Sequence, residues 1–237
     1  MNEQGPVYKS RAASTFWLSA LFVLAAATAC GGGGDDPAPA PTPAPVPAPG
    51  PAPAPAPGAP TTVDVGSIED SHQIGTTFFP EGVTATGGTG QAVAGINCGP
   101  ANLTATKFTH LSIVRNGEQL AIPPRVGIVR DAGGTLVCVY NIHTHSTDRS
   151  GRIHTEGPVP ATYTLGQFFA IWGMPLQTNN VAGITTDALT AVYIVDNNTV
   201  TKFTGDPATI ELTSHRHIVL QLGTDITQIP VYSWSGT

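Results

Sequence analysis

The sequence predicts a mostly β domain of the α+β class, with antiparallel sheets or a sandwich and one short capped helix near residues 164–173. Three features support this prediction. Glycine is abundant, with 27 residues in 237. Threonine and valine, which favour strands, dominate the C-terminal part. Short alternating runs are separated by turn residues, as in proteins built from many short strands.

The clearest strand signal begins after Thr106, where apolar and polar residues alternate as far as Arg115. Asn116-Gly117 follows, and this pair predicts a tight hairpin because both residues tolerate positive φ. We expect the return strand at 119–122, stopped by Pro123-Pro124. Residues 61–91 are expected to be largely irregular, with one or two short strands. Further strands are expected at 126–129, 135–142, 188–195, 200–203, 209–212 and 217–222.

One segment has the pattern of a helix. Thr164-Leu-Gly-Gln167 has the form of a capping box, in which the Thr and Gln side chains satisfy two free backbone amides. Four apolar residues follow at helical spacing, and Gly173 is suited to end the helix in the left-handed conformation. We interpret these residues as the core face that packs the helix on a sheet: Leu165, Phe168, Phe169 and Trp172.

The N-terminal residues have the pattern of an export signal. Lys9 and Arg11 precede an apolar run at 15–29 that is too short for a membrane span. The run ends in Ala27-Thr28-Ala29-Cys30, which resembles the lipobox of bacterial lipoproteins. This resemblance implies that 1–29 is a cleaved signal peptide and that Cys30 carries acyl chains. The alternative is ordinary cleavage that leaves Cys30 as a free thiol.

The residues after Cys30 predict a tethered domain. Proline alternates with alanine from Pro37 to Pro60, a composition typical of an extended polyproline II spacer. We therefore expect a lipidated tether at 30–62 and a single globular domain at 63–237. Gly31 follows the lipidated position, and by the sorting rule of Gram-negative lipoproteins this implies the outer membrane, on its periplasmic or surface face.

The charge pattern argues against one class of partner. The net charge is −6, only 11% of residues are charged, and the Lys and Arg residues are scattered. Without a basic stripe to neutralise phosphates, nucleic-acid binding is not expected. The expected partner is a membrane, reached through the lipid anchor.

Histidines supply the main functional hypothesis. His143 and His145 are two residues apart, so on a strand they share a face. If the chain returns as an antiparallel hairpin with an odd sum of paired residue numbers, as with His145 opposite His154, then His154 and Glu156 join that face. Three histidines and a carboxylate suit a transition metal such as Zn or Cu. His110 is a possible additional ligand.

Three functions remain open at this stage. The first is a metal-binding module. The second is a metal-dependent hydrolase or hydratase, in which an open coordination position activates water and Glu156 acts as base. The third is a surface or interaction module in which the histidines bind no metal. A second HxH pair, His215 and His217, matters only if the fold brings it beside the first.

Two cysteines remain once Cys30 is lipidated. In an oxidising envelope, Cys98 and Cys138 are expected to form a disulfide that closes a loop of about 40 residues. The alternative is thiolate ligation beside the histidines, which would favour Cu(I).

Between Cys98 and about Gly223, the chain resembles a group of bacterial and archaeal envelope proteins of unassigned function. In that group an Asp tends to follow the HTH motif directly, whereas this chain has Ser146 there and a longer turn. The resemblance implies no particular activity. The matching pieces are His110-Leu, Asn116-Gly117, Ile122-Pro-Pro, Cys138-x-Tyr, His143-Thr-His145, Ser150-Gly-x-Ile-His154-x-Glu156 and Thr164-Leu-Gly-Gln-Phe-Phe-x-x-Trp-Gly173.

Overall fold

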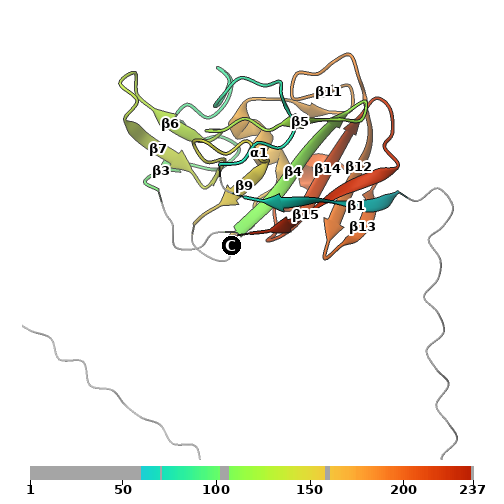
Figure 1. The fold of residues 1–237 in the computed structure, drawn as a ribbon. Coiled ribbons are helices and arrows are strands. Elements are labelled where there is room, and N and C mark those ends of the chain that lie inside the picture. Colours follow the sequence, from blue (N-terminus) through green and yellow to red (C-terminus); the bar gives the residue numbers. More distant parts are fainter. Residues whose placement is uncertain (1–59, 70, 102–106, 158–160, 236–237) are drawn as a thin grey trace, which may run out of the picture. The chain divides into compact units, whose positions relative to one another are not determined.

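A computed structural model describes residues 60–69, 71–101, 107–157 and 161–235 (Figure 1). Strands account for 46% of the structure and helices for 7%, which confirms the predicted mostly β class with one α-helix and several antiparallel sheets. The expected signal peptide, Cys30 and most of the tether lie outside the described residues. Within the described part, no helix has both the length and the apolar character needed to cross a membrane.

The largest sheet has eight strands and carries the histidines. Six of its strands run in the order β13-β12-β14-β4-β5-β2, while β9 pairs with β4 and with β8. Most neighbours are antiparallel, but β14 pairs with β4, and β2 with β5, in parallel. The bounds are β2 Thr76–Thr77, β4 Lys107–Arg115, β5 Glu118–Ala121, β8 Ile142–His143, β9 Arg152–Thr155, β12 Leu189–Asp196, β13 Thr199–Phe203 and β14 His217–Leu222.

Two hairpins of this sheet have tight turns, and the first lies at the predicted Asn116-Gly117 pair. Asn116 and Gly117 join β4 to β5 with φ of 50° and 84°. Asn197 and Asn198 join β12 to β13 with φ of 49° and 63°. Asparagine and glycine tolerate these left-handed conformations better than other residues, so the turn residues fix both hairpins and their registers.

The helix α1, Leu165–Trp172, covers one face of the large sheet. The capping box is present, because the Thr164 hydroxyl accepts from the Gln167 amide and the Gln167 side chain accepts from the Thr164 amide. Gly173 ends the helix with φ 75°. The buried side of the helix packs with alternate residues of β4, such as Leu111 and Ile113, in the main core. The predicted role of the helix as a core element is therefore confirmed.

The opposite face of the sheet is covered by a parallel ribbon of two strands, β1 Thr61–Ile68 and β15 Gln228–Trp234. Figure 1 shows this ribbon crossing the sheet, with the first and last described strands side by side. Ile229 of the ribbon packs on Val114 and Val219 in a second, smaller core. This contact matters for function because the histidines of β4, β9 and β14 share the face of Val114.

A third sheet, in the order β3-β7-β6, lies beyond β8 and contains the disulfide. Its strands are β3 Cys98–Gly99, β6 Ile128–Arg130 and β7 Leu136–Tyr140, and β10 Leu176–Gln177 and β11 Asn180–Val181 form a separate small hairpin. The predicted strand at 209–212 was wrong. A 3-10 helix, η1 Pro207–Thr209, occupies its start, since Asp206 caps the segment and Pro207 favours a helical turn.

Candidate metal centre

The four side chains that the sequence predicts as metal ligands lie close together in the structure. One ligand atom from each of His143, His145, His154 and Glu156 lies within 4.8 Å of the others. Three of these residues are almost completely buried, with exposed fractions of 3% for His143, 3% for His154 and 4% for Glu156. His145 is half-buried. The group therefore sits inside the domain, with His145 as its most accessible member.

Strand pairing places two of the histidines on one face. In the antiparallel pair β8–β9, His143 lies directly opposite His154 and Ile142 opposite Thr155. The sum of paired residue numbers is odd, as the convergence of the ligands requires. The structure moves the pairing by two residues from the register used in the prediction, and such a shift leaves every side chain on the same face.

His145 reaches the group from outside the strand. Strand β8 ends at His143, and the chain then enters the turn that leads to β9. The His145 ring stacks on the His154 ring, with centroids 3.6 Å apart and an interplanar angle of 26°. The opposite side of the site is bounded by Phe108 of β4, whose ring meets that of His154 edge-on at 4.9 Å. Phe108 has no sequence signal of its own, because its position depends on the long-range pairing of β4 with β9.

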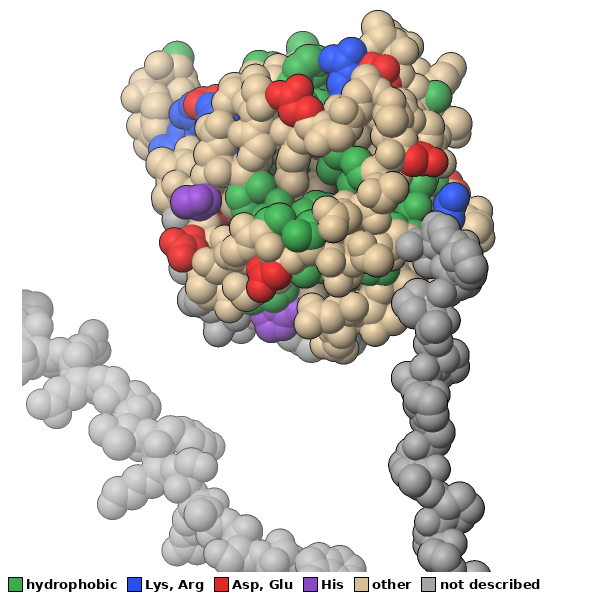
Figure 2. Space-filling view, turned by 45° about the vertical axis from the view of Figure 1, so that its right-hand side comes forward, with side chains coloured by type: hydrophobic (Ala, Val, Ile, Leu, Met, Phe, Trp, Pro, Cys, Tyr) green, Lys and Arg blue, Asp and Glu red, His purple; other side chains and the backbone are tan. Residues whose placement is uncertain are grey.

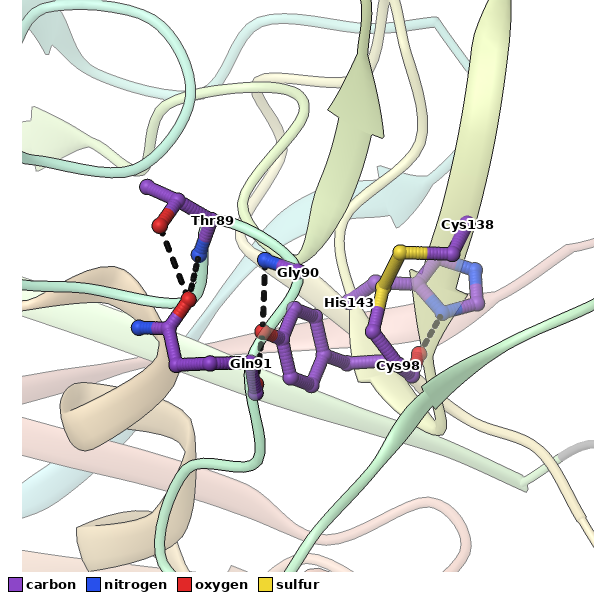
Figure 3. Close-up of a disulfide and its surroundings, with 7 residues drawn as sticks. Thr89, Gly90, Gln91, Cys98, Cys138 and His143 are labelled. Carbon is purple, nitrogen blue, oxygen red and sulfur yellow. Dashed lines mark hydrogen bonds between the residues drawn. A yellow bond between two sulfur atoms is a disulfide. The ribbon is translucent and has the colours of Figure 1, made fainter.

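The backbone fixes the tautomer of His143. Its Nδ1 lies 3.0 Å from the carbonyl oxygen of Tyr140, which can only accept, so Nδ1 carries the proton (Figure 3). Tyr140 is itself fully buried and held in place, since its hydroxyl accepts from the Gly90 amide and donates to the Gln91 carbonyl. The neutral ring therefore presents the lone pair of Nε2, which lies 3.8 Å from Oε1 of Glu156.

Burial keeps the imidazoles neutral. It lowers the pKa of His143 to about 4, against the opposing effect of the Tyr140 hydrogen bond. Burial, together with the neighbouring His145 and His143, lowers the pKa of His154 to about 2. Burial also raises the pKa of Glu156. Neutral imidazole is the form that binds metals, so at neutral pH these rings need lose no proton before they bind.

One nitrogen of the site has no hydrogen-bond partner among the described residues. Nε2 of His154 is buried and has no hydrogen bond to any residue that the structure describes. A buried polar atom without a partner costs about 1–3 kcal/mol. The lone pair of His143 faces a carboxylate in the same group. A cation bound among these atoms would satisfy the His143 lone pair, the carboxylate and the His154 nitrogen together.

The donor set fits a transition metal after a small contraction. Ligand atoms that bind one tetrahedral Zn²⁺ at about 2.0–2.1 Å lie roughly 3.3 Å from one another. In the structure these atoms lie within 4.8 Å of one another, so the side chains must move closer together to bind the ion. His145 can supply much of this movement, because it is only half-buried and lies outside the strand.

The cysteines form the predicted disulfide. Cys98 of β3 and Cys138 of β7 are joined, with their Cα atoms 5.5 Å apart (Figure 3). This pairing excludes the alternative of thiolate ligation, because each sulfur is bonded to the other. The disulfide still bears on the site, since Cys98 pairs with Tyr140, the residue whose carbonyl orients His143.

His110, the possible additional ligand, does not belong to the four-residue group. Its ring packs against His217 and Tyr232, with centroid distances of 4.5 and 4.6 Å. The two histidines of the second HxH pair, His215 and His217, lie in different surroundings. His217 meets His110 inside the domain, whereas His215 is exposed and contacts Trp234.

Comparison with known protein families, with curated proteins and with solved structures finds no match to this chain.

Proposed function

We propose that this protein is a lipid-anchored envelope protein whose β domain binds a transition-metal ion, Zn²⁺ or Cu²⁺, through His143, His145, His154 and Glu156. The observation that carries the proposal is the buried Nε2 of His154, which has no hydrogen-bond partner in the described part of the chain and lies among three other potential ligand atoms. Nitrogen-rich sites with one carboxylate suit these two ions.

The burial of the site supports binding rather than catalysis. A hydrolase or hydratase needs an open coordination position where water and substrate meet the ion. Here three of the four ligand residues are at most 4% exposed, so the protein itself can fill the coordination sphere. The proposed role is therefore to hold or carry the ion.

The proposed anchor rests on the N-terminal sequence. A lipobox-like Ala27-Thr28-Ala29-Cys30 follows an apolar run, and a proline-alanine tether separates it from the domain. We expect the mature protein in a bacterial host to fractionate with membranes. Mass spectrometry should find acyl chains on Cys30, and Cys30→Ala should release the protein from the membrane fraction.

The metal is tested by elemental analysis of the purified full chain. We expect close to one equivalent of Zn or Cu, and re-binding of the same ion after chelation. The double variant His143→Ala/His154→Ala should lose this ion. His72→Ala is the matched control, because His72 is exposed and lies outside the group. A parent protein that neither purifies with a metal nor binds added Zn²⁺ or Cu²⁺ would refute the proposal.

A further inference from the structure

A second group of buried polar side chains lies on the ribbon-covered face of the large sheet. His110 on β4 and His217 on β14 are direct neighbours across the parallel pair, and their rings lie 4.5 Å apart. Ser112 follows His110 on the same face and is fully buried. Apolar residues would fill this position in an ordinary core, so the polar group requires an explanation.

A chain of hydrogen bonds holds this group in one arrangement. Nε2 of His217 lies 2.9 Å from Oγ of Ser112, which also accepts from the Gln119 amide at 3.1 Å. Oε1 of Gln119 accepts from the Tyr232 hydroxyl at 2.8 Å. The chain therefore links His217 to Tyr232 of the ribbon and fixes the orientation of both rings. Side chains that are already fixed lose little conformational entropy when a ligand binds.

Two nitrogens of the group have no hydrogen-bond partner within the described part of the chain. Nε2 of His110 donates to the Ser150 carbonyl at 2.7 Å, so Nδ1 of the neutral ring is a bare acceptor. Neither this Nδ1 nor that of His217 has a hydrogen bond to a described residue, and both are buried. His217 is 5% exposed and forms part of the wall of a surface groove. His217 therefore joins the buried polar group to the wall of the groove, with its Nδ1 buried behind the groove surface.

The groove has the size and surface of a small-ligand site. Its volume is about 690 Å³, within the range of about 300–1,000 Å³ typical of ligand pockets. Tyr232 and Trp234 alternate along β15 and both line the groove, and the Trp234 ring is braced by His215 at 5.0 Å. Asn198 and Asp64 face them from the β12–β13 turn and from β1.

The charge of the groove limits what can bind. No Lys or Arg is present among its lining residues in the described part of the chain, and Asp64 is its one carboxylate. Phosphates and acidic peptides need cationic partners, so they are disfavoured. The lining residues offer instead neutral groups that both donate and accept, beside the half-buried rings of Tyr232 and Trp234.

We propose that this groove binds a neutral saccharide. The apolar C–H faces of a sugar ring pack on aromatic side chains such as Tyr232 and Trp234. Adjacent hydroxyl groups both donate and accept, which matches the side-chain amides of Asn197 and Asn198 in the groove wall. A neutral sugar therefore fits both the aromatic and the uncharged polar parts of the groove wall.

Calorimetric titration of the full chain tests the proposal, with chitotetraose, cellotetraose and maltotetraose as probes at millimolar concentration. We expect at least one of them to bind. Trp234→Ala should weaken that binding by about tenfold or more. Asn198→Gly should also weaken it, and this variant keeps the left-handed turn, since Asn198 has φ 63°. It provides a second measurement if Trp234→Ala is unstable.

The matched control is Phe78→Ala, which removes an exposed aromatic ring outside the groove and should leave binding unchanged. Binding should also persist in a chelator and in the His143→Ala/His154→Ala variant, because the groove does not include the candidate metal centre. Absence of binding for all three sugars overturns the proposal. So does binding of tetramethylammonium in their place, which would make the groove a site for organic cations.

Discussion

Gly151 is the residue whose backbone most directly fixes the histidine-bearing face. It has φ +90°, and a Cβ at this position would lie 2.3 Å from the Leu111 carbonyl oxygen and 3.1 Å from Nε2 of His110. The Leu111 amide donates a hydrogen bond to the Gly151 carbonyl. The two backbone segments therefore cannot move apart to make room for a Cβ without losing this hydrogen bond.

Gly151→Ala should therefore lower the free energy of unfolding by about 2–4 kcal/mol, from backbone strain and the clash together. Urea unfolding measures this change. Gly117→Ala is the control, because Gly117 has φ +84° with nothing within 4 Å of the added Cβ. It should show only the conformational cost of about 1 kcal/mol. Equal losses in the two variants would contradict this explanation.

Glu156 supplies the only carboxylate of the candidate metal centre. Glu156→Gln keeps the shape of the side chain and removes the charge that an ion would attract. We expect Zn²⁺ affinity to fall by about 10–100-fold, the range typical for loss of a carboxylate that supports metal-binding histidines. Competition with a chromogenic chelator measures the affinity. Because an ionised carboxylate beside the His143 lone pair is costly, the metal-free variant should unfold no more easily than the parent.

At the level of elements, the disulfide ties β3 to β7 across 40 residues. In the chain-entropy treatment, a loop of this length stabilises the folded state by about 4 kcal/mol. The double variant Cys98→Ala/Cys138→Ala should show a loss of this order in urea unfolding, and the parent should show the same loss after reduction. A parent protein whose stability does not change on reduction would contradict this prediction.

Elements defined by local pattern were predictable from the sequence. The strand at 107–115, its Asn116-Gly117 hairpin and the capped helix depend on residues close together in the chain, and the structure has all three. The ribbon of β1 and β15 was not predicted as a pair. Its two strands join residues such as Thr61 and Gln228, and no local signal reports a parallel pairing over that distance.

The same distinction applies to the candidate sites. Alternation along the two strands predicted a common face for His143 and His154 only for a register with an odd sum of paired residue numbers, and the structure has such a register. The contact between His110 and His217 could not be predicted, since it depends on the parallel pairing of β4 with β14. The groove was missed for a similar reason, because its walls come from both ends of the domain.

At the scale of the whole molecule, buried histidines make stability depend on pH. Burial lowers the pKa of His110 from 6.5 to about 4, and it lowers the pKa of His217 well below the ordinary value. Between pH 6.5 and about pH 4, these histidines bind protons in the unfolded chain but not in the folded protein. The stabilisation from these residues is therefore complete above pH 6.5 and is lost as the pH falls toward 4.

We expect His110 alone to lower the free energy of unfolding by about 2 kcal/mol between pH 7.5 and pH 5. Urea unfolding in a chelator measures the change without any contribution from metal. Asp148 and Glu156 act in the opposite direction, because burial raises the pKa of each and favours the protonated folded state. His110→Gln separates the two effects, since glutamine can still donate to the Ser150 carbonyl but does not titrate. If His110→Gln loses as much stability as the parent on acidification, His110 is not the group that titrates.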